Sequence, residues 1–193
     1  MGALAFAAPN SAPPDAGVVQ RMLSAAPHRG SQHATAVCGR FALGVAYDIA
    51  APHAWLAAEN GSAAVVVGSV DNAGDLRREL AAANGEAGGD PAEVVLRMFR
   101  AWGEEALTRL RGAFAGAVVD GPTLWYFRDQ LGHRTLFERR DANGLYVATE
   151  AKQVVAGAAI SREPDVQSAE DLFFGRLDTR RSLLAGEIGR AHV

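Results

Sequence analysis

The chain has 193 residues, a length that suits one domain, or one domain plus the beginning of another, built around a single sizeable core. Hydrophobic residues make up 49% of it and charged residues 21%, which is an ordinary globular composition and excludes a disordered or fibrous chain. The formal net charge of -3 gives no electrostatic reason to expect nucleic acid, because neutralising phosphates requires a basic face.

Cysteine usage and hydropathy narrow the class of protein further. The single cysteine, Cys38, excludes an intramolecular disulfide framework and a multi-cysteine metal site, and it fits a reducing cytoplasm. No stretch approaches the roughly 20 apolar residues that span a bilayer. We therefore expect a cytoplasmic protein with no membrane segment and no metal site.

The first part of the chain alternates apolar runs with turn residues. Apolar or β-branched runs predict buried strands at Ala3–Ala8, Phe41–Tyr47 and Ala63–Val70. We expect a loop that holds Trp55 between the last two strands. Asp15 is placed to cap a helix that ends at Ala26, before Pro27.

The second part predicts two helices and then more strands. The helices are expected at Gly74–Ala83 and Pro91–Trp102, with a Gly-rich loop between them, and the strands at Ala113–Val119, Thr123–Phe127 and Gly144–Ala148. Asp120-Gly121-Pro122 is typical of a hairpin turn. Residues 128–140 carry four Arg but also Asp129 and Glu138, which favours a solvated or salt-bridged surface over a binding patch. Grouped strands with helices between them indicate layered sheets flanked by helices.

Three ordered motifs carry a resemblance to a known family. They are Leu110–Asp120 (LRGAFAGAVVD), Phe127–Leu136 (FRDQLGHRTL) and Leu145–Lys152 (LYVATEAK), and upstream His28-Arg29-Gly30 is similar to the family's HRG. Together they resemble the class II glutamine amidotransferase domain of asparagine synthetases. The resemblance implies an α+β fold over residues 1–160, a four-layer α/β/β/α sandwich of the N-terminal-nucleophile hydrolase type. Within it, we expect Arg128 and Asp129 to form a structural ion pair at a strand end.

The catalytic positions that the resemblance implies are not filled as the chemistry requires. The family uses an N-terminal cysteine, whose own amine serves as the base, but removal of Met1 would expose Gly2, which has no side chain. The oxyanion is stabilised by the amide side chain and the backbone N–H of an Asn-Gly pair, and here Val67 precedes Gly68. Cys38 follows the HRG motif instead of preceding it, so we interpret it as a buried, inert thiol.

Two further positions concern the glutamine substrate. The family has a substrate-binding arginine just after the strand segment that matches residues 41–44. Here that place holds Val45, Ala46 and Tyr47. Asp90 matches the acidic residue that would hold the glutamine α-amino group. We therefore predict no intact catalytic residue, and only Gly68 and Asp90 as retained substrate-binding positions.

The function that the resemblance implies is a degenerate glutaminase-type domain of an ATP-dependent amide-forming ligase. ATP and Mg²⁺ are expected in a C-terminal synthetase domain of the same protein, which is the expected partner; a homodimer is also compatible. Residues 161–186 are predicted to be a linker toward that domain. Residues 187–193, EIGRAHV, match the translation of a widely used sequencing adapter, so we expect them to be an artefact.

Two alternatives stay open at this point. One is a genuine glutamine-hydrolysing asparagine synthase whose N-terminus was misread. The other is a non-catalytic binding module that uses the vacated pocket.

Overall fold

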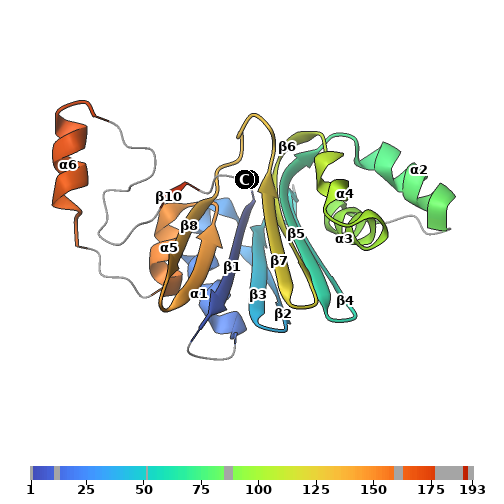
Figure 1. The fold of residues 1–193 in the computed structure, drawn as a ribbon, viewed down its shortest axis with the longest axis horizontal. Coiled ribbons are helices and arrows are strands. Elements are labelled where there is room, and N and C mark those ends of the chain that lie inside the picture. Colours follow the sequence, from blue (N-terminus) through green and yellow to red (C-terminus); the bar gives the residue numbers. More distant parts are fainter. Residues whose placement is uncertain are drawn as a thin grey trace.

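The computed structural model describes residues 2–10, 14–50, 52–84, 89–158, 163–176 and 189–190. Two antiparallel sheets lie face to face (Figure 1), with strand orders β10-β8-β9-β1-β3-β2 and β4-β5-β6-β7. The first sheet contains β1 (Ala3–Pro9), β2 (Gln32–Cys38), β3 (Phe41–Tyr47), β8 (Phe137–Asp141), β9 (Gly144–Ala148) and β10 (Gly189–Arg190). The second contains β4 (Ala54–Glu59), β5 (Ser62–Val70), β6 (Gly112–Asp120) and β7 (Thr123–Arg128).

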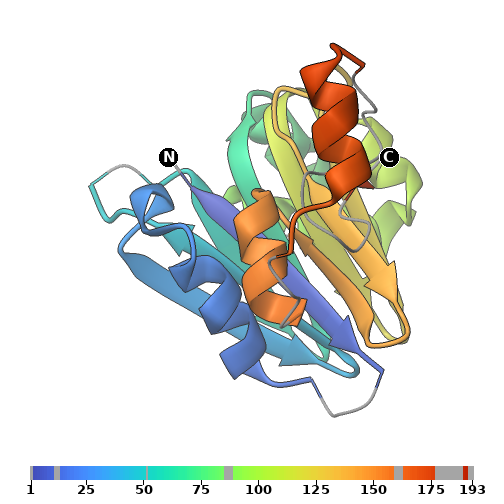
Figure 2. The ribbon, with the colours of Figure 1, turned by 90° about the vertical axis from the view of Figure 1, so that its left-hand side faces the viewer.

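Helices cover the outer face of each sheet. The described helices are α1 (Ala16–Ser24), α2 (Ala73–Asn84), α3 (Pro91–Trp102), the short α4 (Glu105–Thr108), α5 (Ala151–Ala158) and α6 (Val166–Phe173), with a 3₁₀ turn η1 at Pro27–Arg29; of these, α6 lies apart from both sheets (Figure 1). Helices α1 and α5 lie side by side on the first sheet (Figure 2), and α3 packs on the second. The predicted α/β/β/α sandwich is confirmed. None of the described helices is long and apolar enough to cross a membrane.

Strand β1 shows how the sequence builds the layers. Its alternate residues Leu4 and Phe6 enter the core between the two sheets, while Ala3 and Ala5 face the layer under α1 and α5. This follows from the two-residue period of a strand. The large side chains thus fill the space between the sheets, and the small ones let the helices approach closely.

Most predicted elements are present, but the loop expected around Trp55 is wrong. Trp55 lies in β4, which pairs with β5 from Ala54 to Glu59. The segment has few β-branched residues, so its strand propensity is weak, and pairing with the β-branched β5 decides the conformation. Strand β2 was also not predicted. It too has few β-branched residues, and it pairs with β3 along its whole length.

The predicted cap of α1 is confirmed, and the C-terminal segments are described only in part. Asp15 caps α1 by accepting a hydrogen bond from Gly17 N at 2.9 Å. The segment predicted as a linker, residues 161–186, contains α6, and of residues 187–193 only β10 is described. The centre of the predicted Gly-rich loop, residues 85–88, lies outside the described residues.

Asp129 has a structural role, but its partners differ from the prediction. Instead of pairing with Arg128, its buried carboxylate accepts hydrogen bonds from the backbone N–H groups of Leu131, His133 and Arg134 and from the ring of His133. Burial raises the pKa of Asp129, but these hydrogen bonds outweigh burial and lower it. Asp129 therefore organises the loop between β7 and β8.

Candidate functional site

The positions singled out by the chemistry gather mainly at the N-terminal end of β1. Gly2 immediately precedes β1 and is buried. On its two sides lie the C-terminal ends of β3 and β9, because Ala3 pairs with Ala46 and Ala5 pairs with Ala148. The second sheet contributes the start of β4 and the last part of β5.

The carbonyl group of His53 and the side-chain methyl group of Ala54 fill the space beside Gly2. A Cβ atom built on Gly2 would lie 2.6 Å from the Ala54 Cβ and 2.8 Å from the His53 carbonyl oxygen. Both separations are shorter than van der Waals contact. A side chain at this position, such as the expected nucleophile, would require β4 to move.

The His53 carbonyl group also binds the backbone N–H of Gly68. The Gly68 N–H donates to the His53 carbonyl oxygen over 2.8 Å. This pairing continues the β4–β5 ladder, whose register starts at a tight turn where Asn60 and Gly61 both have positive φ. The N–H that would serve an oxyanion is therefore part of the sheet.

Gly68 also has a steric reason to be glycine. Its φ of +103° is a conformation that side-chain-bearing residues rarely adopt, and a Cβ there would lie 2.1 Å from the Ala113 carbonyl oxygen. The close approach of β5 to β6 alone thus requires glycine. The preceding residue, Val67, is fully buried between the sheets.

Among the described residues, Asp90 forms no hydrogen bond with Gly2, Val67 or Gly68. Its Oδ1 accepts from Ala92 N at 2.9 Å and Glu93 N at 3.0 Å, so it caps α3. At the place of the expected arginine, Val45 and Ala46 are buried in the core. The structure therefore brings together Gly2, Val67 and Gly68, but assigns Asp90 to a helix terminus.

Cys38 lies at the opposite end of the first sheet. It pairs with Phe41, whereas Gly2 lies next to the end of β3 at Tyr47. Its side chain is buried, and burial raises the pKa of the thiol. A raised pKa lowers the thiolate fraction and hence the reactivity. Position and electrostatics agree with an inert thiol.

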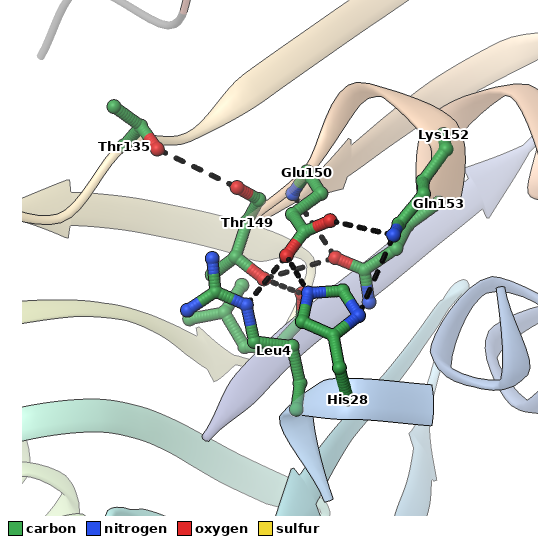
Figure 3. Close-up of polar contacts among 8 residues, drawn as sticks. Leu4, His28, Thr135, Thr149, Glu150, Lys152 and Gln153 are labelled. Carbon is green, nitrogen blue, oxygen red and sulfur yellow. Dashed lines mark hydrogen bonds and ion pairs between the residues drawn. The ribbon is translucent and has the colours of Figure 1, made fainter. Parts of the chain in front are cut away.

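An ion cluster, formed by His28, Arg29, Glu150 and Lys152, lies near the N-terminal end of β1 and was not predicted from the sequence. Glu150 Oε1 lies 2.8 Å from His28 Nε2 and 2.5 Å from Arg29 Nε, and Oε2 lies 3.1 Å from Lys152 Nζ (Figure 3). The HRG and ATEAK motifs thus meet in space. Opposite charges in the two motifs were the available signal, but charge alone does not indicate which distant residues pair.

Hydrogen bonds beneath the ion cluster connect it to β1. Gln153 Oε1 accepts from Thr149 Oγ1 at 2.9 Å and from Glu150 N at 3.0 Å, while Thr149 N donates to the Leu4 carbonyl oxygen at 3.2 Å (Figure 3). On the other side, Gly30 approaches the Tyr47 backbone so closely that a Cβ would lie 2.3 Å from its nitrogen. The turn at residues 28–30 therefore bridges the ends of β3 and β9.

The cluster strongly perturbs the Glu150 carboxyl group. Burial would raise the pKa of Glu150, but hydrogen bonds from Arg29, Lys152 and His28 outweigh it and hold the pKa at about 2 instead of 4.5. The folded state therefore favours the ionised form more than the unfolded state does. This contribution is fully present above pH 4.5 and is lost as the pH falls toward 2.

Replacement of Glu150 should make this pH dependence visible. At neutral pH, Glu150→Gln should lower the free energy of unfolding by about 3 kcal/mol, since one pKa unit corresponds to about 1.4 kcal/mol. The difference from the wild type should shrink as the pH falls below 4.5. Urea unfolding at a series of pH values measures it.

The control is Glu79→Gln, which removes an exposed ion pair with Arg109. It should change stability by less than about 1 kcal/mol. A Glu150→Gln difference that stays constant over the acid range would contradict the role of the ion cluster.

Comparisons with known proteins show which family the chain is similar to. A family model described as a glutamine amidotransferase domain matches residues 1–188. A protein assigned as a glutamine-hydrolyzing asparagine synthetase in Mycobacterium tuberculosis (strain ATCC 25618 / H37Rv) is 39% identical over 89 residues, which is 44% of this chain and 14% of that protein. Asparagine synthetase (glutamine-hydrolyzing) 3 of Bacillus subtilis (strain 168) is 29% identical over 109 residues, covering 55% of this chain and 18% of that protein.

Solved structures share the fold at low sequence identity. Glutamine phosphoribosylpyrophosphate amidotransferase of B. subtilis, solved with ADP and GMP, superposes with a TM-score of 0.64 at 16% identity, over 85% of this chain and 45% of that chain. A structure described as the allosteric regulatory enzyme of purine biosynthesis gives a TM-score of 0.62 at 18% identity, over 81% and 43%. The chain belongs to the glutamine amidotransferase domain family, and parts of it are similar to asparagine synthetases, of whose length the matches cover only 14% and 18%.

Proposed function

We propose that this chain is a glutaminase-type domain that does not hydrolyse glutamine and that serves an ATP-dependent, amide-forming ligase related to asparagine synthetases. The observation that carries the proposal is the position of the His53 carbonyl group and the Ala54 methyl group. Both occupy the space of a side chain at Gly2, and the His53 carbonyl oxygen also accepts a hydrogen bond from the Gly68 N–H.

Glutaminase chemistry requires groups that this strand end lacks. A thiol must attack the amide carbon with a neighbouring base, and donors must stabilise the oxyanion. Gly2 has no side chain, Val67 has no amide and the Gly68 N–H is bound within the sheet. Because loss of one oxyanion donor already costs about 3 kcal/mol, these changes together support an inactive site.

The two retained family positions do not weaken this proposal. Gly68 is required by the close approach of Ala113, and Asp90 is required by the N-terminus of α3. Each is explained by the stability of the fold without a substrate. Their presence therefore gives no separate support for glutamine binding.

The remaining chemistry of the proposed ligase would belong to another part of the protein. The matched segments span only 14% and 18% of the relatives' lengths, so further domains exist in those relatives. We propose that ATP and Mg²⁺ bind in a synthetase domain of the same protein, as the resemblance to asparagine synthetases implies; these 193 residues contain no Ser-Gly-Gly-Xaa-Asp-Ser loop. That domain would be the partner of this one.

A glutaminase assay tests the proposal. The purified chain should release glutamate from glutamine no faster than buffer does, with or without a thiol alkylator, since no activated thiol lies at the strand end. Cys38→Ser should behave identically, because the Cys38 thiol is buried at the far end of the sheet. Glutamate release that the alkylator abolishes would instead support a genuine glutamine-hydrolysing enzyme.

Restoring a thiol should also fail. We expect Gly2→Cys to lower the free energy of unfolding by about 1–3 kcal/mol, the usual range for overpacking, and to produce no glutaminase activity. The matched control is Gly74→Cys, where no atom lies within 4 Å of the new Cβ, so that overpacking is absent. Thermal unfolding and the glutaminase assay measure the two effects. A stable Gly2→Cys variant that releases glutamate would overturn the proposal.

A further inference from the structure

Helix α6 presents an apolar face that neither sheet covers. Val166, Leu172 and Phe173 are 65%, 47% and 86% exposed, and the helix contains no buried residue. With Ala169 they form one stripe along the helix, because they are spaced by three and four residues as in an amphipathic helix. Figure 1 shows the helix apart from both sheets. The stripe is therefore a packing surface that no described residue buries.

The length of α6 makes a packing partner necessary. The helix has eight residues, and Asp165 caps its N-terminus. Isolated helices shorter than about 12–15 residues are marginal in water, because the first turn fixes several residues for a single hydrogen bond. Most helices in proteins gain their stability from packing of the apolar face. A stable α6 therefore requires that its stripe be covered.

The loop of residues 129–136, which joins β7 to β8, presents an apolar side chain to solvent. Asp129 accepts backbone hydrogen bonds from Leu131, His133 and Arg134, so the loop is held in one shape. In that shape Leu131 is 83% exposed. The loop thus offers a fixed apolar contact point at the end of β7.

Two arginines of this region have no acidic partner within the described part of the chain. Residues 128–140 contain four arginines, of which Arg139 and Arg140 pair with acidic residues of β8. Arg128 and Arg134 form no such pair. The contact point at the end of β7 is therefore flanked by positive charge that its own loop does not neutralise.

Helix α6 carries the opposite charge beside its stripe. Glu170 lies one turn after Val166, and its carboxylate forms no ion pair or hydrogen bond among the described residues. Asp171 follows it and accepts one hydrogen bond, from Gln167 at 3.4 Å. Opposite charges around an apolar contact fix its orientation and disfavour wrong partners. The charges thus favour an acidic amphipathic helix, such as α6, as the occupant of the loop surface.

The path of the chain allows α6 to reach this loop. Helix α5 begins next to Thr149, whose carbonyl oxygen accepts a hydrogen bond from Thr135 of the loop at 3.5 Å. The eight residues of α5 extend about 12 Å from there, and the seven residues 159–165 span up to about 24 Å. Figures 1 and 2 show α6 running opposite to α5, so its C-terminal end lies toward the same end of the molecule as the loop.

We propose that α6 docks on the β7–β8 loop, with Phe173 over Leu131 and Glu170 facing Arg128 and Arg134. The helix then acts as a strap that closes this side of the domain. The docking is independent of the glutaminase chemistry. It also brings the chain that follows α6 toward the strand end at Gly2, where a synthetase domain would begin; this consequence alone rests on the proposed function.

Disulfide trapping tests the contact. In a Cys38→Ser background, the pair Leu131→Cys/Phe173→Cys should form an intramolecular disulfide on mild oxidation, because docking brings the two Cβ atoms to the separation of about 3.5–4.5 Å that a disulfide needs. The matched control is Ile49→Cys/Phe173→Cys. Ile49 is 77% exposed and follows β3, which two strands separate from β8. Trapping of the control pair as fast as the first pair would overturn the proposal.

Hydrogen exchange of the α6 amides, followed by NMR, measures the docking without a cross-link. Leu131→Asp should speed their exchange by about tenfold or more, since burial of one large apolar side chain shifts an equilibrium by roughly that factor. The amides of the two sheets should be unaffected, because Leu131 is exposed. Ile49→Asp should leave α6 unchanged. Equal exchange of α6 in the wild type and in Leu131→Asp would contradict the docking.

A charge swap tests the orientation of the helix. Arg134→Glu or Glu170→Arg alone places like charges at the contact and should speed the exchange of the α6 amides. The double variant Arg134→Glu/Glu170→Arg restores opposite charges and should recover the protection of the wild type. If the double variant exchanges as fast as the single variants, or if no variant differs from the wild type, the proposed facing of Glu170 and the arginines is wrong.

Discussion

The close contact of the His53 carbonyl group and the Ala54 methyl group with Gly2, together with the hydrogen bond from Gly68 to His53, is the constraint on which the proposed inactive site depends. It follows from local rules: the Asn60-Gly61 turn sets the register of β4 on β5, and that register places His53 opposite Gly68. The glycine at position 2 then allows β4 to lie against the end of β1. The two sheets meet at this strand end through the His53 carbonyl group and the Ala54 methyl group, in the space that a side chain at Gly2 would need.

Side chains outside the proposed inactive site stabilise the fold. The ion cluster at Glu150 links the turn at residues 28–30 to the end of β9, and Asp129 organises the loop after β7. Both carboxylates are largely buried, and both have pKa values lowered by their hydrogen-bond donors. A domain held in this way can keep its architecture without any glutaminase activity, which is consistent with a scaffolding role.

The fold was largely predictable because hydrophobic patterns report on burial. The β-branched run at residues 63–70 and the apolar face of α3 identify a strand and a helix from local sequence. The strands β2 and β4 were not predictable in this way, since neither has a continuous β-branched run or a clear alternation of apolar and polar residues. The four-layer sandwich was predicted from the resemblance of three motifs to a known family, and not from hydrophobic periodicity.

The candidate site was predictable only in part. The sequence shows that Gly2 has no side chain and that Val67 has no amide, but it cannot show that the Gly68 N–H is bound or that Asp90 caps a helix. Likewise, the partners of Arg128 and Asp129 depend on how a loop folds back on itself. Such contacts depend on the tertiary structure. They involve backbone groups, which nearly every residue carries, so the residue types alone do not predict them.

The most direct test of the central claim is the amide hydrogen exchange of Gly68, followed by NMR with and without glutamine. A buried N–H bonded to His53 should exchange slowly, and its chemical shift should not respond to saturating glutamine. Rapid exchange, or a shift and new protection on addition of glutamine, would show that the donor is available to a ligand. That result would contradict the account of a closed strand end.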